Sequence, residues 1–178
     1  LLPVITAENE ITTDEEEIRQ MAKLGLQKGQ IEADEAAMIS KVFQLNDLTA
    51  RDLMTPRVSA PTLDSSTTLK ELQKSLLTNN SQSWVVLGKE VDKVLGIAKR
   101  ERLLTALIQG HTQLTPIDLC EVVEFVPEMI RADKLLTCFN KDKAGVRVVV
   151  DEFGGFVGLI DAEAVLSVLA GWWRKTNQ

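Results

Sequence analysis

The sequence predicts an α+β fold in which two β-α-β-β-α units pack sheet against sheet, preceded by an N-terminal helical segment. From residue 48 onward, short runs rich in β-branched residues alternate with short helical patterns. The order of these elements then recurs, with an offset of 63 residues between Leu69 and Ala132 and of 62 between Gly96 and Gly158. Because one such unit leaves a sheet face uncovered, a single fold with a shared core is expected.

Residues 1–47 are expected to form an irregular start followed by two helices. Thr13 and Glu16 have the spacing of a capping box, and the helix that they begin should run to about Leu26. Gly29 breaks it, and a second helix should run over about 33–45. On the inner side of the first helix we expect Ile18, Met21 and Leu24 or Gly25. On the second helix, Met38, Val42 and Leu45 should form one stripe, flanked by Ile39 and Phe43.

Residues 48–110 form the first predicted repeat. The residues just before Leu69 carry several hydroxyls that can cap a helix, and leucines at helical spacing follow. Two apolar runs on either side of a polar turn then predict a pair of strands, and a last helix should stop at Gly110. These strands and the closing helix are expected over 84–87, 94–98 and 100–109.

Residues 111–178 form the second predicted repeat, in the same order. Gly154 and Gly155 allow the positive φ that a tight hairpin needs, and the two flanking apolar runs should be its strands. A helix containing Leu135 and Phe139 precedes the hairpin. The remaining elements expected are strands over 122–126, 146–150 and 156–160 and a closing helix over 162–173.

Composition argues against several classes of function. The formal net charge of −6 is unfavourable for nucleic-acid binding, which needs clustered cations. Cys120, Cys138 and the one histidine, His111, lack metal-ligand spacing, so we expect no metal site. His111 also has no apparent nucleophile beside it, so we expect no catalytic residues and no enzyme. No apolar run approaches the roughly 18 residues of a membrane span, so a soluble polypeptide is expected.

Two segments of the chain resemble the signatures of a known family. They are Arg51-Asp52-Leu53-Met54-Thr55-Pro56-Arg57 and Val150-Asp151-Glu152-Phe153-Gly154-Gly155. Together they resemble the paired CBS module of the CorC/CNNM (hemolysin-C-like) family of membrane proteins. The stretch from Gly29 to Met54 is similar to the family's segment that joins the membrane domain to the CBS pair. The resemblance covers roughly residues 13–171.

The resemblance implies a regulatory, non-enzymatic module from a membrane protein associated with magnesium or cobalt transport. It implies a homodimer formed through the CBS repeats, and a membrane domain of the same parent protein as a further partner. The module would lie on the cytoplasmic side of the inner membrane and relay a change of conformation. AMP, ADP or ATP is the ligand that the resemblance implies. The alternative is a ligand-free module that only dimerises or assembles.

The two signature segments also suggest where a nucleotide would bind. Pro56 fixes its own φ and pushes Thr55 towards an extended conformation, which can present the Thr55 hydroxyl beside the first strand. Arg57 offers a planar fork that can grip phosphate. The candidate nucleotide-binding residues are Thr55, Pro56, Arg57, Lys99, Arg102, Arg147 and Asp161.

The sequence departs from the family's nucleotide motif in both repeats. In CBS repeats that bind adenosine compounds, the last strand leads into Gly-h-h-(Ser/Thr)-x-x-Asp, whose hydroxyl and carboxylate serve the phosphate and the ribose. Here Lys99 and Arg102 stand at those two positions in the first repeat, and Asp161 and Ala164 in the second. Arg102 is donor-only and Ala164 has no acceptor, so each unmet ribose hydroxyl would cost roughly 1–3 kcal/mol.

Other interpretations of the same residues remain open. Asp161 is a good helix N-cap whether or not a ligand binds. Arg147 stands where the family commonly has a small residue, and its side chain could occupy the cleft itself. A basic pocket that holds phosphate without a ribose clamp is a further hypothesis. The cations that would converge there are Arg57, Lys99, Arg100, Arg102 and Arg147.

Overall fold

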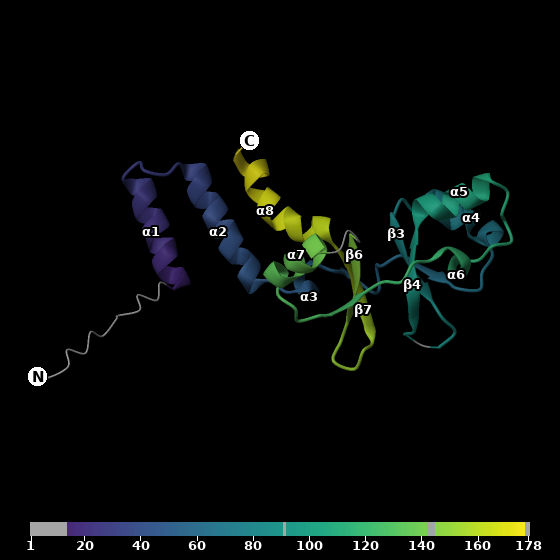
Figure 1. Cartoon of the computed structure of the whole chain (residues 1–178). Coiled ribbons are helices and arrows are strands. Elements are labelled where there is room, and N and C mark those ends of the chain that lie inside the picture. The colour runs from purple at the N-terminus through teal and green to yellow at the C-terminus, as the bar shows by residue number, and fades with distance from the viewer. Residues whose placement is uncertain (1–13, 91, 142–144, 177–178) are drawn as a thin grey trace, which may run out of the picture. The chain divides into compact units, whose positions relative to one another are not determined.

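The computed structural model describes residues 14–90, 92–141 and 145–176, with side chains up to residue 170 (Figure 1). The chain divides into two compact units. One contains the residues up to Gln44 together with those from Leu169 onward, and the other is Leu45–Val168. None of the helices in the described part of the chain has both the length and the apolar character that a bilayer crossing needs.

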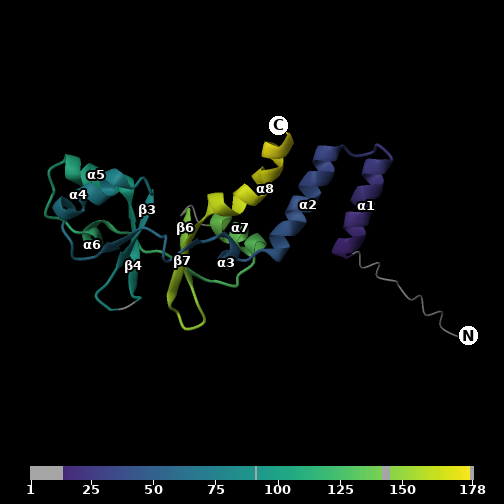
Figure 2. The same ribbon diagram turned by 180° about the vertical axis from the view of Figure 1, so that it is seen from behind.

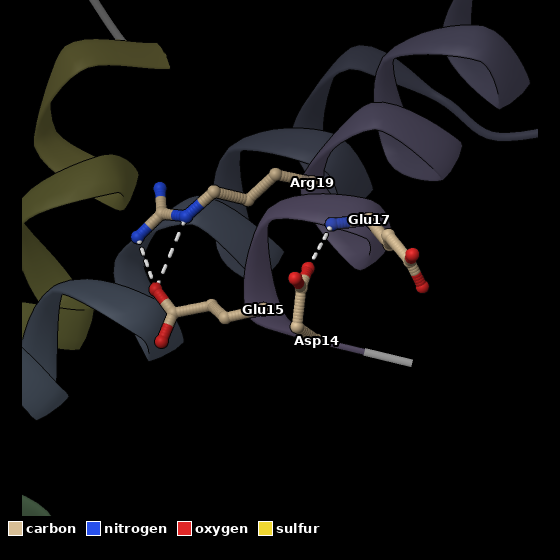
Figure 3. A network of polar contacts seen from close by, with 4 residues as sticks. All are labelled: Asp14, Glu15, Glu17 and Arg19. Carbon is tan, nitrogen blue, oxygen red and sulfur yellow. Dashed lines mark hydrogen bonds and ion pairs between the residues drawn. The ribbon is translucent and has the colours of Figure 1, made fainter. Parts of the chain in front are cut away.

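The first unit begins with α1 (Glu15–Gln27), which is followed by α2 (Ala33–Asp47). Thr13, the cap expected from the sequence, lies outside the described residues. Asp14 caps the helix, because its Oδ1 accepts a hydrogen bond of 2.9 Å from the backbone N–H of Glu17 (Figure 3). One turn further on, Arg19 pairs with Glu15 at 2.7 Å. The described start of the first helix therefore has a local polar network.

The apolar faces of α1 and α2 are less buried than the sequence predicts. The side chains expected to face inward on α1 and α2 are 39% to 64% exposed, apart from Leu45 at 4%. Two helices alone cover only part of each other, and an amphipathic stripe needs a further layer to be fully buried. The inner side expected on α1 is therefore partly exposed at Ile18, Met21 and Leu24, whereas Met38 and Val42 of α2 line one hollow together with Ile18, as members of a common stripe do.

The second unit contains the repeated order of strands and helices that the sequence predicts. Its first half has α3 (Ala50–Leu53), β1 (Thr55–Pro56), β2 (Thr62–Asp64), α4 (Leu69–Thr78), β3 (Ser83–Leu87), β4 (Val94–Lys99) and α5 (Arg100–Ile108). Its second half has α6 (Pro116–Leu119), β5 (Phe125–Pro127), α7 (Ala132–Lys141), β6 (Val146–Val150), β7 (Phe156–Asp161) and the start of α8 (Ala162–Thr176). The α+β fold with two β-α-β-β-α repeats is thus confirmed.

Each repeat forms the body of one sheet. In the first sheet, β2 runs parallel to β3 and β3 antiparallel to β4. In the second, β5 runs parallel to β6 and β6 antiparallel to β7. The two sheets lie in the middle of this unit, with α4 and α5 beyond one of them and α7 beyond the other (Figure 1, Figure 2). The hairpins β3–β4 and β6–β7 extend towards the same side in both views.

The start of the first predicted repeat joins the sheet of the second. Thr55 of β1 pairs with Leu159 of β7, so β1 becomes the edge strand of the second sheet. Upstream, the backbone N–H of Ala50 donates to the Ile130 carbonyl at 2.9 Å, and that of Ala132 donates to the Leu48 carbonyl at 2.9 Å. The segment 48–57 is therefore exchanged between the repeats.

Alternate positions along β3 and β4 pack on opposite sides of the first sheet. Val85 and Ile97 of the first sheet pack with Val148, Phe156 and Leu159 of the second, which closes the space between the sheets. The neighbouring positions of the first sheet point the other way and pack under its helices. This second cluster contains Leu63, Leu69, Leu76, Trp84, Val86, Ala98, Leu103 and Ala106. The leucine stripe expected from Leu69 onward thus packs into this cluster, whereas Ile108 of α5, which was expected to face inward, is exposed.

The β6–β7 turn has the hairpin geometry that its glycines predict. Gly154 has a φ of +79°, which an L-residue with a side chain adopts only at a cost. Asp151 Oδ1 accepts hydrogen bonds of 2.9 Å from the Phe153 N–H and 2.8 Å from the Gly155 N–H. The Asp151 carboxylate thus satisfies two backbone donors of the turn. The geometry of the turn therefore accounts for Asp151 and Gly154 in this segment.

Candidate functional site

Two hollows occupy corresponding places in the two repeats, and we call them cleft A and cleft B. Cleft A has a volume of about 350 Å³, and its polar lining includes Thr55, Ser59, Asn80, Ser81, Ser83 and Asp161. Cleft B has a volume of about 740 Å³, and among the described residues its charged lining consists of Lys99, Glu121, Glu124, Lys141 and Arg147. Each cleft is formed by the end of one repeat's last strand, β7 or β4, together with the chain segment that then leads into the sheet of the other repeat.

A glycine lets the chain approach closely at cleft A. The Arg57 N–H donates to the Val157 carbonyl at 2.8 Å, and β1 lies directly against Gly158. A Cβ at Gly158 would stand 2.7 Å from the Thr55 carbonyl oxygen and 2.5 Å from Met54 Sδ. Because Gly158 has no side chain, β1 can approach β7 closely enough for Thr55 to line the same cleft as Asp161.

Cleft B is built in the same way. The N–H groups of Ile97 and Glu121 donate to each other's carbonyls at 2.9 and 2.8 Å. A Cβ at Gly96 would collide with the Glu121 carbonyl oxygen. Gly96 and Gly158 are the pair that first indicated the repeat. Their shared role is to admit a crossing segment at each cleft.

Cleft A is rich in acceptors and hydroxyls and has no lysine or arginine among its described lining residues. Asp161 caps α8, because its Oδ1 accepts from the Ala164 N–H at 2.8 Å. The interpretation of Asp161 as an N-cap therefore holds, and the same carboxylate still lines the cleft. Such a surface can accept hydrogen bonds from ribose hydroxyls, but its charge opposes a phosphate.

Arg57 does not line either cleft in the described structure. Its guanidinium forms an ion pair with Asp92 in the β3–β4 turn. It also lies 5.6 Å from the centre of the Phe156 ring, at the start of β7. Arg57 thus joins the hairpins of both repeats, while Pro56 pairs with Gly158 inside the sheet.

Two cations of cleft B, Lys99 and Arg147, have defined partners. Lys99 Nζ donates to Ser83 Oγ at 3.0 Å. Arg147 is 1% exposed, and its guanidinium donates to the Val146 carbonyl at 3.0 Å and lies 5.3 Å from the Phe139 ring. Glu124 Oε2 is 3.5 Å from its Nε. The side chain of Arg147 therefore lies at cleft B, one of the two repeat-related clefts, and does not line cleft A.

The five cations proposed for one basic pocket do not all meet. Lys99 and Arg147 line cleft B, whereas Arg100 donates to the Leu76 carbonyl at 3.0 Å and Arg57 faces Asp92. Arg102 pairs with Glu121 at 3.0 Å, at the margin of the cleft. The hypothesis that these five cations converge in one pocket is therefore wrong. Of the five, Lys99 and Arg147 line cleft B.

Sequence reasoning missed Lys141, Ser59 and Ser81. Lys141 ends α7 and corresponds to Thr78 at the end of α4 in the first repeat, and Ser81 lies in the connection between α4 and β3. The repeat indicates that both segments precede a central strand, but no spacing singles out either side chain. Ser59 belongs to an irregular stretch with no periodic signal, so only the structure shows its place in cleft A.

Comparison with known proteins agrees with this geometry. The family model for the CBS domain matches residues 50–109. A solved "CBS domain of the bacterial CNNM/CorC family Mg2+ transporter" superposes with a TM-score of 0.81 at 29% identity, over 89% of this chain and 97% of that one. The same domain in complex with ATP gives 0.71 at 30% identity, over 77% and 97%. The chain belongs to the CNNM/CorC family.

The CBS pair also matches curated proteins of greater length. It is 46% identical over 160 residues to the UPF0053 protein sll1254 of Synechocystis, which covers 90% of this chain and 46% of that protein. The chain therefore spans less than half the length of this relative. The expected family and the expected fold of this CBS pair are confirmed.

Proposed function

We propose that this CBS pair is the non-enzymatic regulatory part of a membrane protein that moves magnesium or cobalt, on the cytoplasmic side of the membrane. We further propose that cleft A receives the adenosine part of a nucleotide. The observation that carries the proposal is the pairing of β1 with β7, which brings Thr55 and Asp161 to one cleft. The solved relative in complex with ATP supports the same ligand class.

The lining of cleft A suits a nucleoside better than a polyphosphate. Its volume of about 350 Å³ lies at the small end of ligand sites. Val146 and Leu159 offer apolar walls for a base, and the hydroxyls with Asp161 offer acceptors for a ribose. Each added phosphate brings negative charge towards Asp161. Affinity should therefore fall from adenosine to ATP unless Mg²⁺ neutralises the phosphates.

A ligand in cleft A would connect two parts of the fold. It would touch Thr55 in the exchanged segment 48–57 and Ser59 just after it, and Asp161 and Ala164 at the start of α8. Binding would favour the arrangement in which these groups are close, because a ligand shifts a conformational equilibrium only through its differential contacts. This is the step by which the CBS pair would relay occupancy to a membrane domain of the same parent protein.

Isothermal titration with adenosine, AMP, ADP and ATP, each with and without Mg²⁺, tests the proposal. Binding in cleft A should be lost in Thr55→Val together with Ser59→Ala and kept in Ser66→Ala, a serine in the β2–α4 connection that does not line the cleft. Binding must also raise the melting temperature by mass action. Absence of heat and of any thermal shift at millimolar ligand would overturn the ligand assignment.

A second candidate function is assembly without a ligand. Exposed apolar residues lie on helices of both repeats, with Ile108 of α5 at 86% exposure, Leu77 on α4 and Leu166 on α8. Such residues support a homodimer through the CBS repeats, since apolar side chains concentrate in the cores of interfaces. Sedimentation of the wild type and of Ile108→Glu checks this, and a monomer in both would sink it.

A further inference from the structure

The loop between α4 and β3 forms one wall of cleft A. α4 ends at Thr78 and β3 begins at Ser83, and residues 79–82 between them have no regular secondary structure. The lining of the cleft includes Asn80, Ser81 and Gln82 of this loop. Since a mostly exposed loop buries little of its own surface, its conformation depends on its hydrogen bonds to the rest of the fold.

Two hydrogen bonds fasten this loop from its inner side. The indole Nε1–H of Trp84 donates to the Ser81 carbonyl at 2.8 Å. The backbone N–H of Arg100, the first residue of α5, donates to the Gln82 carbonyl at 2.9 Å. Each donor therefore holds one carbonyl of the wall.

Trp84 is held in place by the core under the helices of the first sheet. It is 4% exposed and belongs to the cluster that contains Leu69 of α4 and Leu103 of α5. A buried indole N–H needs an acceptor, and the carbonyl of Ser81 supplies it. The ring cannot move without repacking this cluster, so it gives the loop a fixed anchor.

Arg100 makes the start of α5 a second anchor. The N–H of the first helical residue has no acceptor within the helix, and here it bonds to Gln82 instead. The guanidinium of the same residue donates to the Leu76 carbonyl near the end of α4 at 3.0 Å. Arg100 thus bonds both to the helix before the loop and to the loop itself.

We propose that Trp84 and the N–H of Arg100 are positioning groups for the ligand site in cleft A, an inference that rests on the adenosine site proposed above. Neither is among the described residues that line the cleft. They act through the loop, which they hold in the conformation that presents Asn80, Ser81 and Gln82 to a ligand. The protein then does not have to order this wall when the ligand arrives, so the cost of that ordering is absent from binding.

Trp84→Phe and Arg100→Pro each remove one of the two hydrogen bonds. Phe keeps an aromatic ring in the core without the indole donor. Pro lacks the N–H and suits the first position of a helix, and the φ of −79° and ψ of 131° at Lys99 are compatible with a following proline. Arg100→Pro is compared with Arg100→Ala, so that the loss of the guanidinium cancels. Leu103→Val is the control for Trp84→Phe, because it loosens the same cluster and keeps both anchors.

Amide hydrogen exchange of the ligand-free chain is measured first. Exchange over residues 79–83 should be faster in Trp84→Phe than in Leu103→Val, and faster in Arg100→Pro than in Arg100→Ala. Calorimetric titration with adenosine should then show about fivefold weaker binding in each of these two comparisons, which corresponds to one hydrogen bond. Leu103→Val should have a lower melting temperature and the wild-type affinity, since a loss of stability alone does not change how the folded protein binds.

Two results would overturn the role of the anchors. One is exchange over residues 79–83 at the wild-type rate in both Trp84→Phe and Arg100→Pro. The other is an adenosine affinity that stays at the wild-type value in both variants, or that falls equally in Leu103→Val. Absence of heat with the wild type would instead count against the adenosine site itself, and the exchange measurement would still decide whether the two anchors hold the loop.

Discussion

Lys99 and Ser83 face each other across the β3–β4 pair, and the hydrogen bond of 3.0 Å between them joins the two clefts. Lys99 lines cleft B and Ser83 lines cleft A. A group that binds the ammonium in cleft B competes with the Ser83 hydroxyl for it. Occupancy of one cleft therefore changes the hydrogen bonding of the other, and any such coupling is reciprocal.

Ser83→Ala should lower the stability of the fold. The substitution removes the hydroxyl that accepts the hydrogen bond from Lys99 across the β3–β4 pair. A loss of unfolding free energy of about 0.5–1.5 kcal/mol is expected for the lost hydrogen bond. Chemical denaturation of the wild type and the variant measures it. Unchanged stability would contradict a contribution of this hydrogen bond.

Ala164→Asp should tighten adenosine binding in cleft A. The new carboxylate supplies the acceptor that the family's motif has at this position, and a neutral hydrogen bond or better is worth about 1 kcal/mol or more. Roughly fivefold to tenfold tighter binding of adenosine is expected by calorimetry. Ala164→Asn is the matched control for size. No change in either variant would show that the ribose does not approach α8.

The ion pair between Arg57 and Asp92 should contribute measurably to stability. Both side chains are partly exposed, so a coupling energy of about 0.5–1 kcal/mol is expected. Arg57→Gln, Asp92→Asn and the double variant form the cycle, measured by urea unfolding. Asn suits position 92 because it tolerates the φ of 65° found there. Strictly additive effects would mean that the pair does not hold the hairpins together.

Gly158→Ala should destabilise the fold and disturb cleft A together. The added methyl meets Met54 and the backbone of Thr55, so β1 must move away from β7. Overpacking of this kind costs about 1–3 kcal/mol. Gly88→Ala is the control, since its Cβ would make only ordinary contacts of 3.5 Å with Leu95. Equal stability of the two variants would refute the close approach.

Acid should weaken the fold through three capping carboxylates. Hydrogen bonds from the backbone N–H and then from the hydroxyl of Thr49, Thr68 and Thr115 lower the pKa of Asp52, Glu71 and Asp118 respectively. A folded-state pKa below the unfolded one gives stability that is present above the unfolded pKa, about 4, and is lost as the pH falls through the folded pKa. The melting temperature should therefore be flat between about pH 5 and 7 and fall below about pH 4. Glu71→Gln should reduce the slope, and a rise in stability on acidification would contradict it.

The sequence predicts well those parts of the fold that depend on local pattern. The leucine stripe from Leu69, the hairpin at Gly154 and the paired glycines 96 and 158 each reflect a short-range requirement of spacing or φ. These predictions agree with the structure because each depends on such a short-range requirement. The placement of β1 has no such signal, because two residues show no periodicity and their partner lies about a hundred residues away.

The candidate site was harder to predict for the same reason. Thr55 and Asp161 do line one cleft, and Lys99 and Arg147 line the other, but no local pattern says which residues share a cleft. Arg57 has the chemistry of a phosphate ligand, yet Asp92 in a distant turn takes its guanidinium. A binding role for these residues stays a prediction until a titration tests it.

The exchange of segment 48–57 onto the second sheet bears on how the two halves could be separated. A cut near residue 110 would leave the C-terminal piece without its edge strand and the N-terminal piece with an orphaned one. Neither piece should be a stable protein on its own. Mixed together, they should reconstitute a noncovalent complex, so the exchanged strand makes this chain a natural candidate for a split reporter.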